Sequence, residues 1–90
     1  MRKIKIEKRA QKFLKRLPRK QARQARGKIS SLLEHPSPPD SKLLKGYVYR
    51  SMDVGEYRVI YKADEETVTI LLVGKRNDSD VYRRLDRLGL

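Results

Sequence analysis

Three prolines fall within four consecutive positions near the middle of the chain, in the segment Pro36-Ser37-Pro38-Pro39. Proline lacks the backbone N–H and fixes φ, so this segment can form neither a helix interior nor a central strand. Apolar residues recur with a helical period before the segment and alternate as in strands after it. The sequence therefore predicts a mainly helical first half and a β second half, joined by a stiff connector over residues 34–41.

The first half begins with a charged–apolar alternation over residues 2–6, which predicts a short edge strand. From Glu7 the period becomes helical. The residues that share one face of this first helix are Ala10, Phe13, Leu14 and Leu17. Pro18 separates it from a second predicted helix over about residues 19–33, because proline is tolerated only in a first helical turn. The buried side of the second helix is predicted to hold Ala22, Ala25, Ile29, Leu32 and Leu33. The two helices form a hairpin.

Three β segments follow the connector. The first is predicted to start at Tyr47–Arg50, the second to span Tyr57–Lys62, and the third to be the β-branched run Thr67–Val73. Asp53–Glu56 and Asp64–Glu66 are predicted as the connecting turns. A last helix is predicted over Val81–Leu88, capped by Asn77, Asp78 or Ser79. The predicted fold is α+β in a single domain, residues 1–90: an N-terminal strand, a two-helix hairpin, a three-stranded antiparallel meander and a short C-terminal helix.

The alternation within the strands predicts which face the helices cover. One apolar set is Tyr57, Val59 and Tyr61, and the matching set in the next strand is Val68, Ile70 and Leu72. These sets are expected to meet the helices, because successive strand residues point to opposite faces. Arg58 is then expected on the opposite face, beside Thr69 or Leu71.

Charge limits the kinds of partner. Lys and Arg number 23 against 11 acidic residues, a formal net charge of +12. This surplus predicts a polyanionic partner, since each phosphate contact by Lys or Arg releases counterions. The chain has no cysteine and one histidine, which excludes disulfides, thiolate zinc sites and a paired-histidine mechanism. Without an apolar run of about 20 residues or a signal-peptide stretch, a cytoplasmic protein with no membrane contact is predicted.

Motifs for nucleotide or metal binding are absent from the sequence. Asp78 and Asp80 fit a helix cap better than a metal site, and His35 fits the end of the second helix better than a catalytic role. The notable group is basic and aromatic. Its members are Arg50, Arg58, Lys75, Arg76 and Tyr82, with Arg83 and Arg84 adjacent. On composition alone, a phosphate-binding surface is the favoured function of this group and catalysis the alternative.

The chain also resembles a known family. The segments that carry the resemblance are Leu43-Leu44-Lys45-Gly46-Tyr47, Val54-Gly55-Glu56-Tyr57-Arg58-Val59-Ile60-Tyr61, Val73-Gly74-Lys75-Arg76 and Val81-Tyr82, with Phe13-Leu14-x-x-Leu17-Pro18 and Pro38-Pro39-Asp40-Ser41-x-x-Leu44 in the first half. In order and spacing they are similar to the RelE branch of the RelE/ParE toxin superfamily, over nearly the whole chain. The family's fold is the β-α-α-β-β-β arrangement predicted above.

The resemblance implies a toxin of a type II toxin–antitoxin system that cleaves messenger RNA in the ribosomal A site, without metal or cofactor, and that a cognate acidic antitoxin holds inactive. The toxin alone is expected to be a monomer. Arg58, Arg76 and Tyr82 match the family's catalytic positions. Tyr82 is the candidate general base, and Arg58 stabilises the transition state. The remaining residues expected to bind RNA or phosphate are Lys45, Lys75, Arg83 and Arg84.

One strand departs from the family pattern. The family carries two spaced basic residues before the glycine turn, and here Arg50 alone is basic in Tyr49-Arg50-Ser51-Met52-Asp53. Arg50 is therefore included among the catalytic candidates, as a cation beside Tyr82. The departure keeps two alternatives open. One is a ParE-like toxin that poisons DNA gyrase and is no nuclease, and the other is an RNA- or ribosome-binding module with weakened catalysis.

Overall fold

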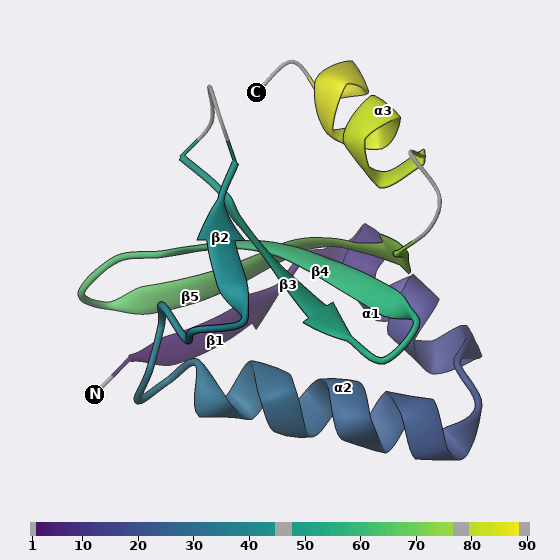
Figure 1. Ribbon diagram of the computed structural model, residues 1–90, viewed down its shortest axis with the longest axis horizontal. Coiled ribbons are helices and arrows are strands. Elements are labelled where there is room, and N and C mark those ends of the chain that lie inside the picture. The colour runs from purple at the N-terminus through teal and green to yellow at the C-terminus, as the bar shows by residue number, and fades with distance from the viewer. Residues whose placement is uncertain (1, 45–47, 77–79, 89–90) are drawn as a thin grey trace.

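Five strands form one mixed sheet in the order β1-β5-β4-β3-β2. The structure, a computed structural model, describes residues 2–44, 48–76 and 80–88. The strands are β1 (Lys3–Ile6), β2 (Ser41–Leu43), β3 (Arg50–Val54), β4 (Tyr57–Ala63) and β5 (Thr67–Lys75). β1 runs parallel to β5, and the other neighbours are antiparallel. β1 is an edge strand, as its sequence predicts (Figure 1).

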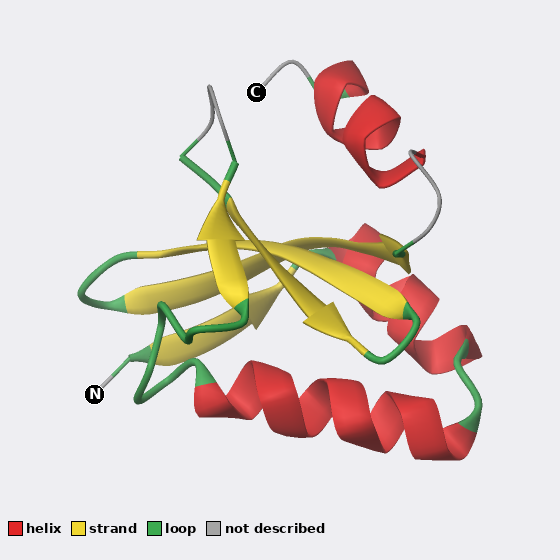
Figure 2. Ribbon diagram, in the orientation of Figure 1, coloured by secondary structure: helices red, strands yellow, loops and turns green. Residues whose placement is uncertain are grey.

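Helices cover both faces of this sheet (Figure 2). α1 (Lys8–Arg16) and α2 (Arg19–Ser31) form the predicted hairpin and lie on one face. α3 (Asp80–Arg87) packs against the other. α1 ends because Leu17 is extended, with ψ of 146°, the conformation favoured before Pro18. The predicted caps Asn77, Asp78 and Ser79 lie outside the described residues. None of the described helices is long and apolar enough to cross a membrane.

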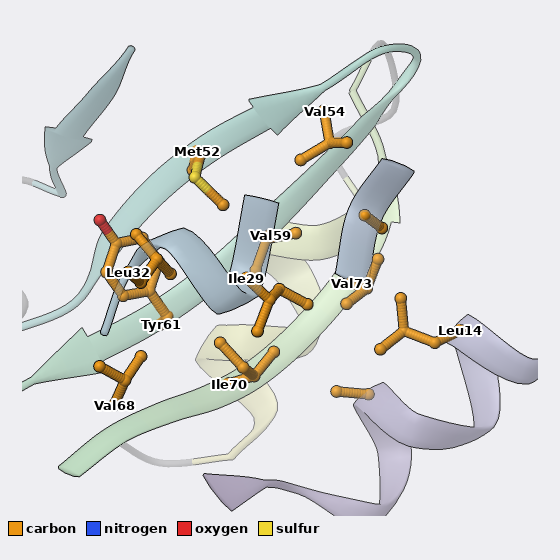
Figure 3. Packing of buried hydrophobic residues seen from close by; sticks show 12 residues of the cluster. Leu14, Ile29, Leu32, Met52, Val54, Val59, Tyr61, Val68, Ile70 and Val73 are labelled. Carbon is orange, nitrogen blue, oxygen red and sulfur yellow. The ribbon is translucent and has the colours of Figure 1, made fainter. Parts of the chain in front are cut away.

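The main core lies between the helical hairpin and the sheet (Figure 3). Leu14 of α1 and Ile29 of α2 meet Val59 and Tyr61 of β4 there. The other members of this cluster are Ala10, Ala25, Leu32, Met52, Val54, Val68, Ile70 and Val73. The buried phenol of Tyr61 donates a hydrogen bond to the Pro36 carbonyl at 2.8 Å. The proline-rich connector is thereby fixed to the main core.

A second, smaller cluster lies under α3. Val81 and Leu85 of α3 pack on Ile60, Leu71 and Leu72 of the sheet. Tyr49 completes the buried set, and Leu44 and Leu88 pack at its margin. Because the two clusters lie on opposite faces of the sheet, α3 buries its apolar side without contributing to the main core.

A bulge in β5 allows that strand to supply both clusters. Ile60 pairs with Leu72, whereas the next residue, Tyr61, pairs with Ile70, so Leu71 is an extra residue. Beyond the bulge the alternation is inverted. The predicted placement of Leu72 against the helical hairpin is therefore wrong: Val73 occupies that core and Leu72 packs under α3. Arg58 accordingly pairs with Gly74, and the expectation that it neighbours Thr69 or Leu71 is also wrong.

The predicted α+β class and element order are confirmed, with two differences in the β region. β2 was not expected, because the connector before it is rich in proline; it adds an edge strand beside β3. β3 starts at Arg50 and continues through Val54, so Asp53 belongs to the strand and the turn is only Gly55-Glu56. Tyr47, the predicted start of this strand, lies outside the described residues.

Candidate active site

Arg58 joins three elements on the α3 face of the sheet. Its Nε donates to Oδ1 of Asp53 at 2.8 Å, and its Nη1 donates to Oη of Tyr82 at 2.6 Å. The guanidinium carbon also lies 5.7 Å from the centroid of the Tyr82 ring. The Arg58 side chain is only 16% exposed, whereas that of Asp53 is 41% exposed. β3, β4 and α3 therefore meet at one arginine.

The β3–β4 hairpin sets the position of Arg58 relative to Asp53. Gly55 has a φ of 58°, a left-handed conformation that suits glycine in a two-residue hairpin turn. The turn places Val54 opposite Tyr57 and Asp53 directly opposite Arg58. Directly opposed residues of an antiparallel pair have neighbouring side chains on one face, so this register alone brings the carboxylate to the guanidinium.

Gly74 sets the position of Tyr82. It lies in β5 opposite Arg58, and a Cβ built on it would overlap Cγ2 of Val81. The missing side chain lets α3 approach the sheet closely enough for Val81 to be buried and for Tyr82, the next residue, to reach Arg58. Arg84 adds a long contact of 3.5 Å from its Nη1 to the Val73 carbonyl. Glycine in the sheet is thus what brings the phenol to the arginine.

The hydrogen bond that Arg58 donates to Asp53 is the largest influence on the charge of Arg58 and raises its pKa above the ordinary value. Partial burial acts in the opposite direction, and the nearby Tyr82 oxygen raises the pKa further. A guanidinium has five N–H donors, and two of the nitrogens are engaged by Asp53 and Tyr82. The remaining donors of a permanently charged Arg58 can bind phosphate oxygens.

The strand register places Arg76 on the face of this group and Lys75 on the opposite face. The backbone N–H of Arg76 bonds to the Glu56 carbonyl at 2.8 Å, which continues the β4–β5 ladder past its last pair. Continued alternation from Gly74 places Arg76 on the face of Arg58, and its side chain is exposed. Lys75 pairs with Tyr57, whose ring packs edge-on against Phe13 of α1, so Lys75 belongs to the opposite face. The expected grouping of Lys75 with Tyr82 is therefore wrong.

Arg50 is also separated from Tyr82, contrary to expectation. It pairs with Tyr61, and it alternates with Met52 and Val54 toward the helical hairpin, which puts it on the opposite face from Arg58. Its Nε and Nη2 both donate to Oγ of Ser41 at 3.2 Å, at the β2 edge. The strand alternation, unresolved at the sequence level, is the reason for this correction.

The other predicted phosphate-binding residues have different positions. Arg83 is exposed on α3, and Arg84 is half-buried beside Val73. Lys45 lies outside the described residues. Among the residues that the structure does describe, no three His, Cys, Asp or Glu side chains lie together as a potential metal-binding group.

Asp53 is the residue of this site that sequence reasoning missed. It was assigned to a turn, and it is one of three residues, Ser51, Met52 and Asp53, at the place where the resemblance implies a second base. The two-residue spacing around Gly55 contained the signal, because a tight turn at Gly55-Glu56 makes Asp53 and Arg58 directly opposed.

The chain also matches a known protein family. Residues 4–79 match the family described as "ParE toxin of type II toxin-antitoxin system, parDE". A comparison with curated protein sequences gives no match.

Solved structures give a more specific likeness. The RelE–RelB complex from the archaeon Pyrococcus horikoshii OT3 matches with 28% identity and a TM-score of 0.75, over 83% of this chain and 94% of that one. The isolated E. coli RelE toxin matches with 26% identity and a TM-score of 0.73, over 100% of both chains. A variant E. coli RelE in the free state, at 24% identity, shares the fold with a TM-score of 0.80 over 97% of this chain and 96% of that one. The chain belongs to the ParE toxin family of type II toxin–antitoxin systems and, within that superfamily, to its RelE-like branch.

Proposed function

We propose that this toxin is an endoribonuclease that cleaves messenger RNA on the ribosome, with no metal ion in its chemistry. The observation that carries the proposal is the hydrogen bond between Arg58 and Tyr82. It brings a permanent cation and an acid–base group together on a face that also holds the exposed Arg76. These are the two kinds of group that cleavage of RNA by its own 2′-hydroxyl requires.

Each residue has a distinct role in the proposed reaction. Tyr82, as the phenolate, accepts the proton of the 2′-hydroxyl while the 2′-oxygen bonds to phosphorus and the bond to the 5′-oxygen breaks. The hydrogen bond from Arg58 holds the Tyr82 oxygen in place, and the remaining Arg58 donors stabilise the charge on the phosphorane. Arg76 neutralises the charge on the departing 5′-oxygen. A guanidinium is a poor acid, so this oxygen takes its proton from solvent.

The proposal requires the ribosome because the site residues recognise the phosphates of RNA and not its bases. Arg58 and Arg76 are cations, and Tyr82 is already hydrogen-bonded to Arg58, so the substrate's strained geometry has to be imposed by another body. Cleavage of a substrate held in the reactive geometry is much faster than cleavage of one that diffuses freely. Modest side-chain chemistry is therefore sufficient on the ribosome.

An acidic antitoxin is the proposed physiological inhibitor. The toxin's net charge of +12 favours rapid capture by an anionic protein. The structural relatives include RelE toxins solved together with antitoxins, among them the archaeal RelE–RelB complex. We place the contact on the α3 face, where one binding event covers Arg58 and Tyr82 together.

The proposal is tested by comparing messenger RNA on programmed ribosomes with the same RNA free in solution. Purified toxin should cleave the ribosome-bound RNA at least about 10²-fold faster, in line with the gain from positioning. Tyr82→Phe should abolish most of this activity. Tyr57→Phe is the matched control, because it removes a phenol oxygen from the opposite face. Equal rates on bound and free RNA would contradict the ribosome requirement.

A gyrase-directed toxin is the second candidate, favoured by Asp53. The segment Ser51-Met52-Asp53 lacks the second basic residue of the family pattern, and the Asp53 carboxylate partly neutralises Arg58. The two functions separate after brief expression in a bacterial host. Discrete cuts in transcripts, mapped by primer extension, support the nuclease, whereas DNA damage with intact transcripts supports the gyrase poison.

A further inference from the structure

The helical hairpin carries a cationic surface that the proposed cleavage does not use. Ten of the chain's 23 Lys and Arg residues lie between Lys8 and Lys28, and no Asp or Glu occurs from Lys8 to Leu33. Lys28 pairs with Asp40, and the other nine cations are exposed. Within the described part of the chain, none of these nine forms an ion pair. Their charge is therefore available to a partner.

Six of these cations form a continuous surface, which we name the hairpin patch. Its residues are Lys8, Lys12, Lys15, Arg19, Arg23 and Arg26. They line two shallow hollows, one along α1 and one between α1 and α2, and Lys15 borders both. Along α2, Arg19, Arg23 and Arg26 are spaced by four and three residues, which puts them in one row about one helical turn apart.

The hairpin patch lies on the far side of the sheet from Arg58 and Tyr82. α1 and α2 cover the face that holds the main core, whereas α3 lies on the other (Figure 1). The hydrogen-bonded pair Arg58 and Tyr82 is on the α3 face. A strand of RNA bound at Arg58 cannot lie on the hairpin patch at the same point along its length. The two surfaces therefore bind separate segments of polyanion.

The uncharged side chains of the hairpin indicate the kind of polyanion. From Lys8 to Arg26, all of which the structure describes, the exposed side chains are Lys, Arg and Gln, apart from Pro18. The apolar residues Ala10, Leu14 and Ala25 are buried, and the ring of Phe13 packs on Tyr57. Leu17 and Ala22 are half-buried and line the hollow between α1 and α2 together with the cations. Binding of single strands relies on aromatic rings on which bases stack, and membrane insertion relies on exposed apolar groups. A surface of cations and amides matches a sugar–phosphate backbone instead.

We propose that the hairpin patch binds the backbone of a double-helical nucleic acid through its phosphates, independently of the Arg58 site. Long Lys and Arg side chains on two adjoining helices can reach phosphates on either side of a groove without reading bases. This binding requires no cleavage, so it is measurable without ribosomes and its outcome is separate from that of the proposed nuclease activity.

The test measures binding of the full chain to labelled 20-base-pair duplexes by fluorescence anisotropy, across a series of salt concentrations. The probes are duplex RNA, duplex DNA, single-stranded RNA and a polyglutamate peptide. The variant Lys8→Gln/Lys12→Gln/Lys15→Gln removes three patch charges. Its matched control, Lys3→Gln/Lys5→Gln/Lys62→Gln, removes three exposed lysines from strands β1 and β4. A second patch variant, Arg19→Gln/Arg23→Gln/Arg26→Gln, covers the possibility that one triple substitution disturbs α1.

Loss of three phosphate contacts should weaken duplex binding about 10²-fold near 0.1 M salt and make the salt slope shallower by about three. Both patch variants should show this loss and the control should not. Patch-dependent binding to either duplex supports the inference. The duplex that binds more tightly, RNA or DNA, is then the nucleic acid that the hairpin patch prefers. An equal loss in the control would overturn it, because net charge alone would then explain binding. Patch-dependent preference for single-stranded RNA or for polyglutamate would also overturn it, the latter in favour of an acidic protein.

Discussion

The phenol oxygen of Tyr82 accepts a hydrogen bond of 2.6 Å from Nη1 of Arg58, a residue 24 positions earlier in the chain. The donor lies in a strand and the acceptor in the terminal helix, so the pair exists only while α3 is docked on the sheet.

Arg58→Ala should slow single-turnover cleavage on programmed ribosomes by about 10²–10³-fold, about 2–4 kcal/mol, the range for a lost preorganised donor. Ribosome affinity should change little, because the remaining cations keep most of the favourable charge. Arg58→Lys should recover only part of the rate, since a point charge cannot bond to Asp53, Tyr82 and phosphate at once. Near wild-type rates for Arg58→Ala would remove this residue from the active site.

Asp53 is predicted to position Arg58. Asp53→Ala removes the acceptor for Nε of Arg58 and should slow single-turnover cleavage. The activation free energy should rise by about 1.5–3 kcal/mol, the range for hydrogen bonds to charged groups. Asp53→Asn retains an oxygen acceptor and should restore much of the rate. It should also tighten RNA binding at low salt, because one negative charge is lost beside the phosphate site. A rate increase in Asp53→Ala would identify the carboxylate as an inhibitor of Arg58 instead.

Two glycines offer a matched comparison of packing. Gly74→Ala introduces a methyl group that overlaps Val81, so α3 should shift, with a cost of about 1–3 kcal/mol in the free energy of unfolding and a loss of cleavage. Gly27→Ala, in α2, meets no atom within 4 Å and should raise stability by about 0.4–1 kcal/mol with activity unchanged. Urea unfolding and cleavage assays on both variants check this. Normal activity in Gly74→Ala would mean that α3 docking does not require close approach.

Much of this architecture follows from local sequence patterns, and the exceptions are local too. The period of Ala10, Phe13, Leu14 and Leu17 was sufficient to place α1, because burial of one helical face decides the structure there. The faces of β5 could not be predicted, since a single extra residue at Leu71 inverts the alternation that Val68 and Ile70 establish. For the site, residue types identified Arg58 and Tyr82, whereas the separation of Arg50 and Lys75 depended on strand register.

Stability should also depend on pH through Asp64. The backbone N–H groups of Thr67 and Glu66 donate to its Oδ1 at 2.7 and 2.8 Å and hold its pKa below the ordinary value. Unfolding removes these donors and lets the carboxyl bind a proton more readily. The stability that Asp64 contributes is therefore complete above its unfolded-state pKa and is lost as the pH falls through the lower folded-state pKa.

Asp64→Asn should therefore flatten the acid limb of a plot of unfolding free energy against pH and leave the slope in the neutral region unchanged. Glu65→Gln removes the same charge from the same turn and serves as the control. An identical acid limb in wild type and Asp64→Asn would show that this carboxylate does not couple folding to protons.

Antitoxin binding should displace α3. α3 has only eight residues, too few for a stable isolated helix, so an antitoxin element that occupies its docking surface on the sheet would release it. Hydrogen exchange on the toxin, alone and with an antitoxin obtained by co-purification, checks this. Displacement predicts faster amide exchange across Val81–Leu88 in the complex. Greater protection there would leave simple exclusion from the ribosome as the mode of inhibition.

The extra residue at Leu71 also limits how the chain can change length. β5 consists of two segments of opposite phase, one ending at Ile70 and one beginning at Leu72. Without Leu71 the strand would keep a single phase and Gly74 would still lie opposite Arg58. A residue gained or lost between Leu72 and Gly74 would instead turn Gly74 toward the helical hairpin and put a side chain under Val81 in its place. The gene can therefore gain or lose codons in the exposed Asp64–Glu66 loop ahead of β5 far more readily than beyond the bulge.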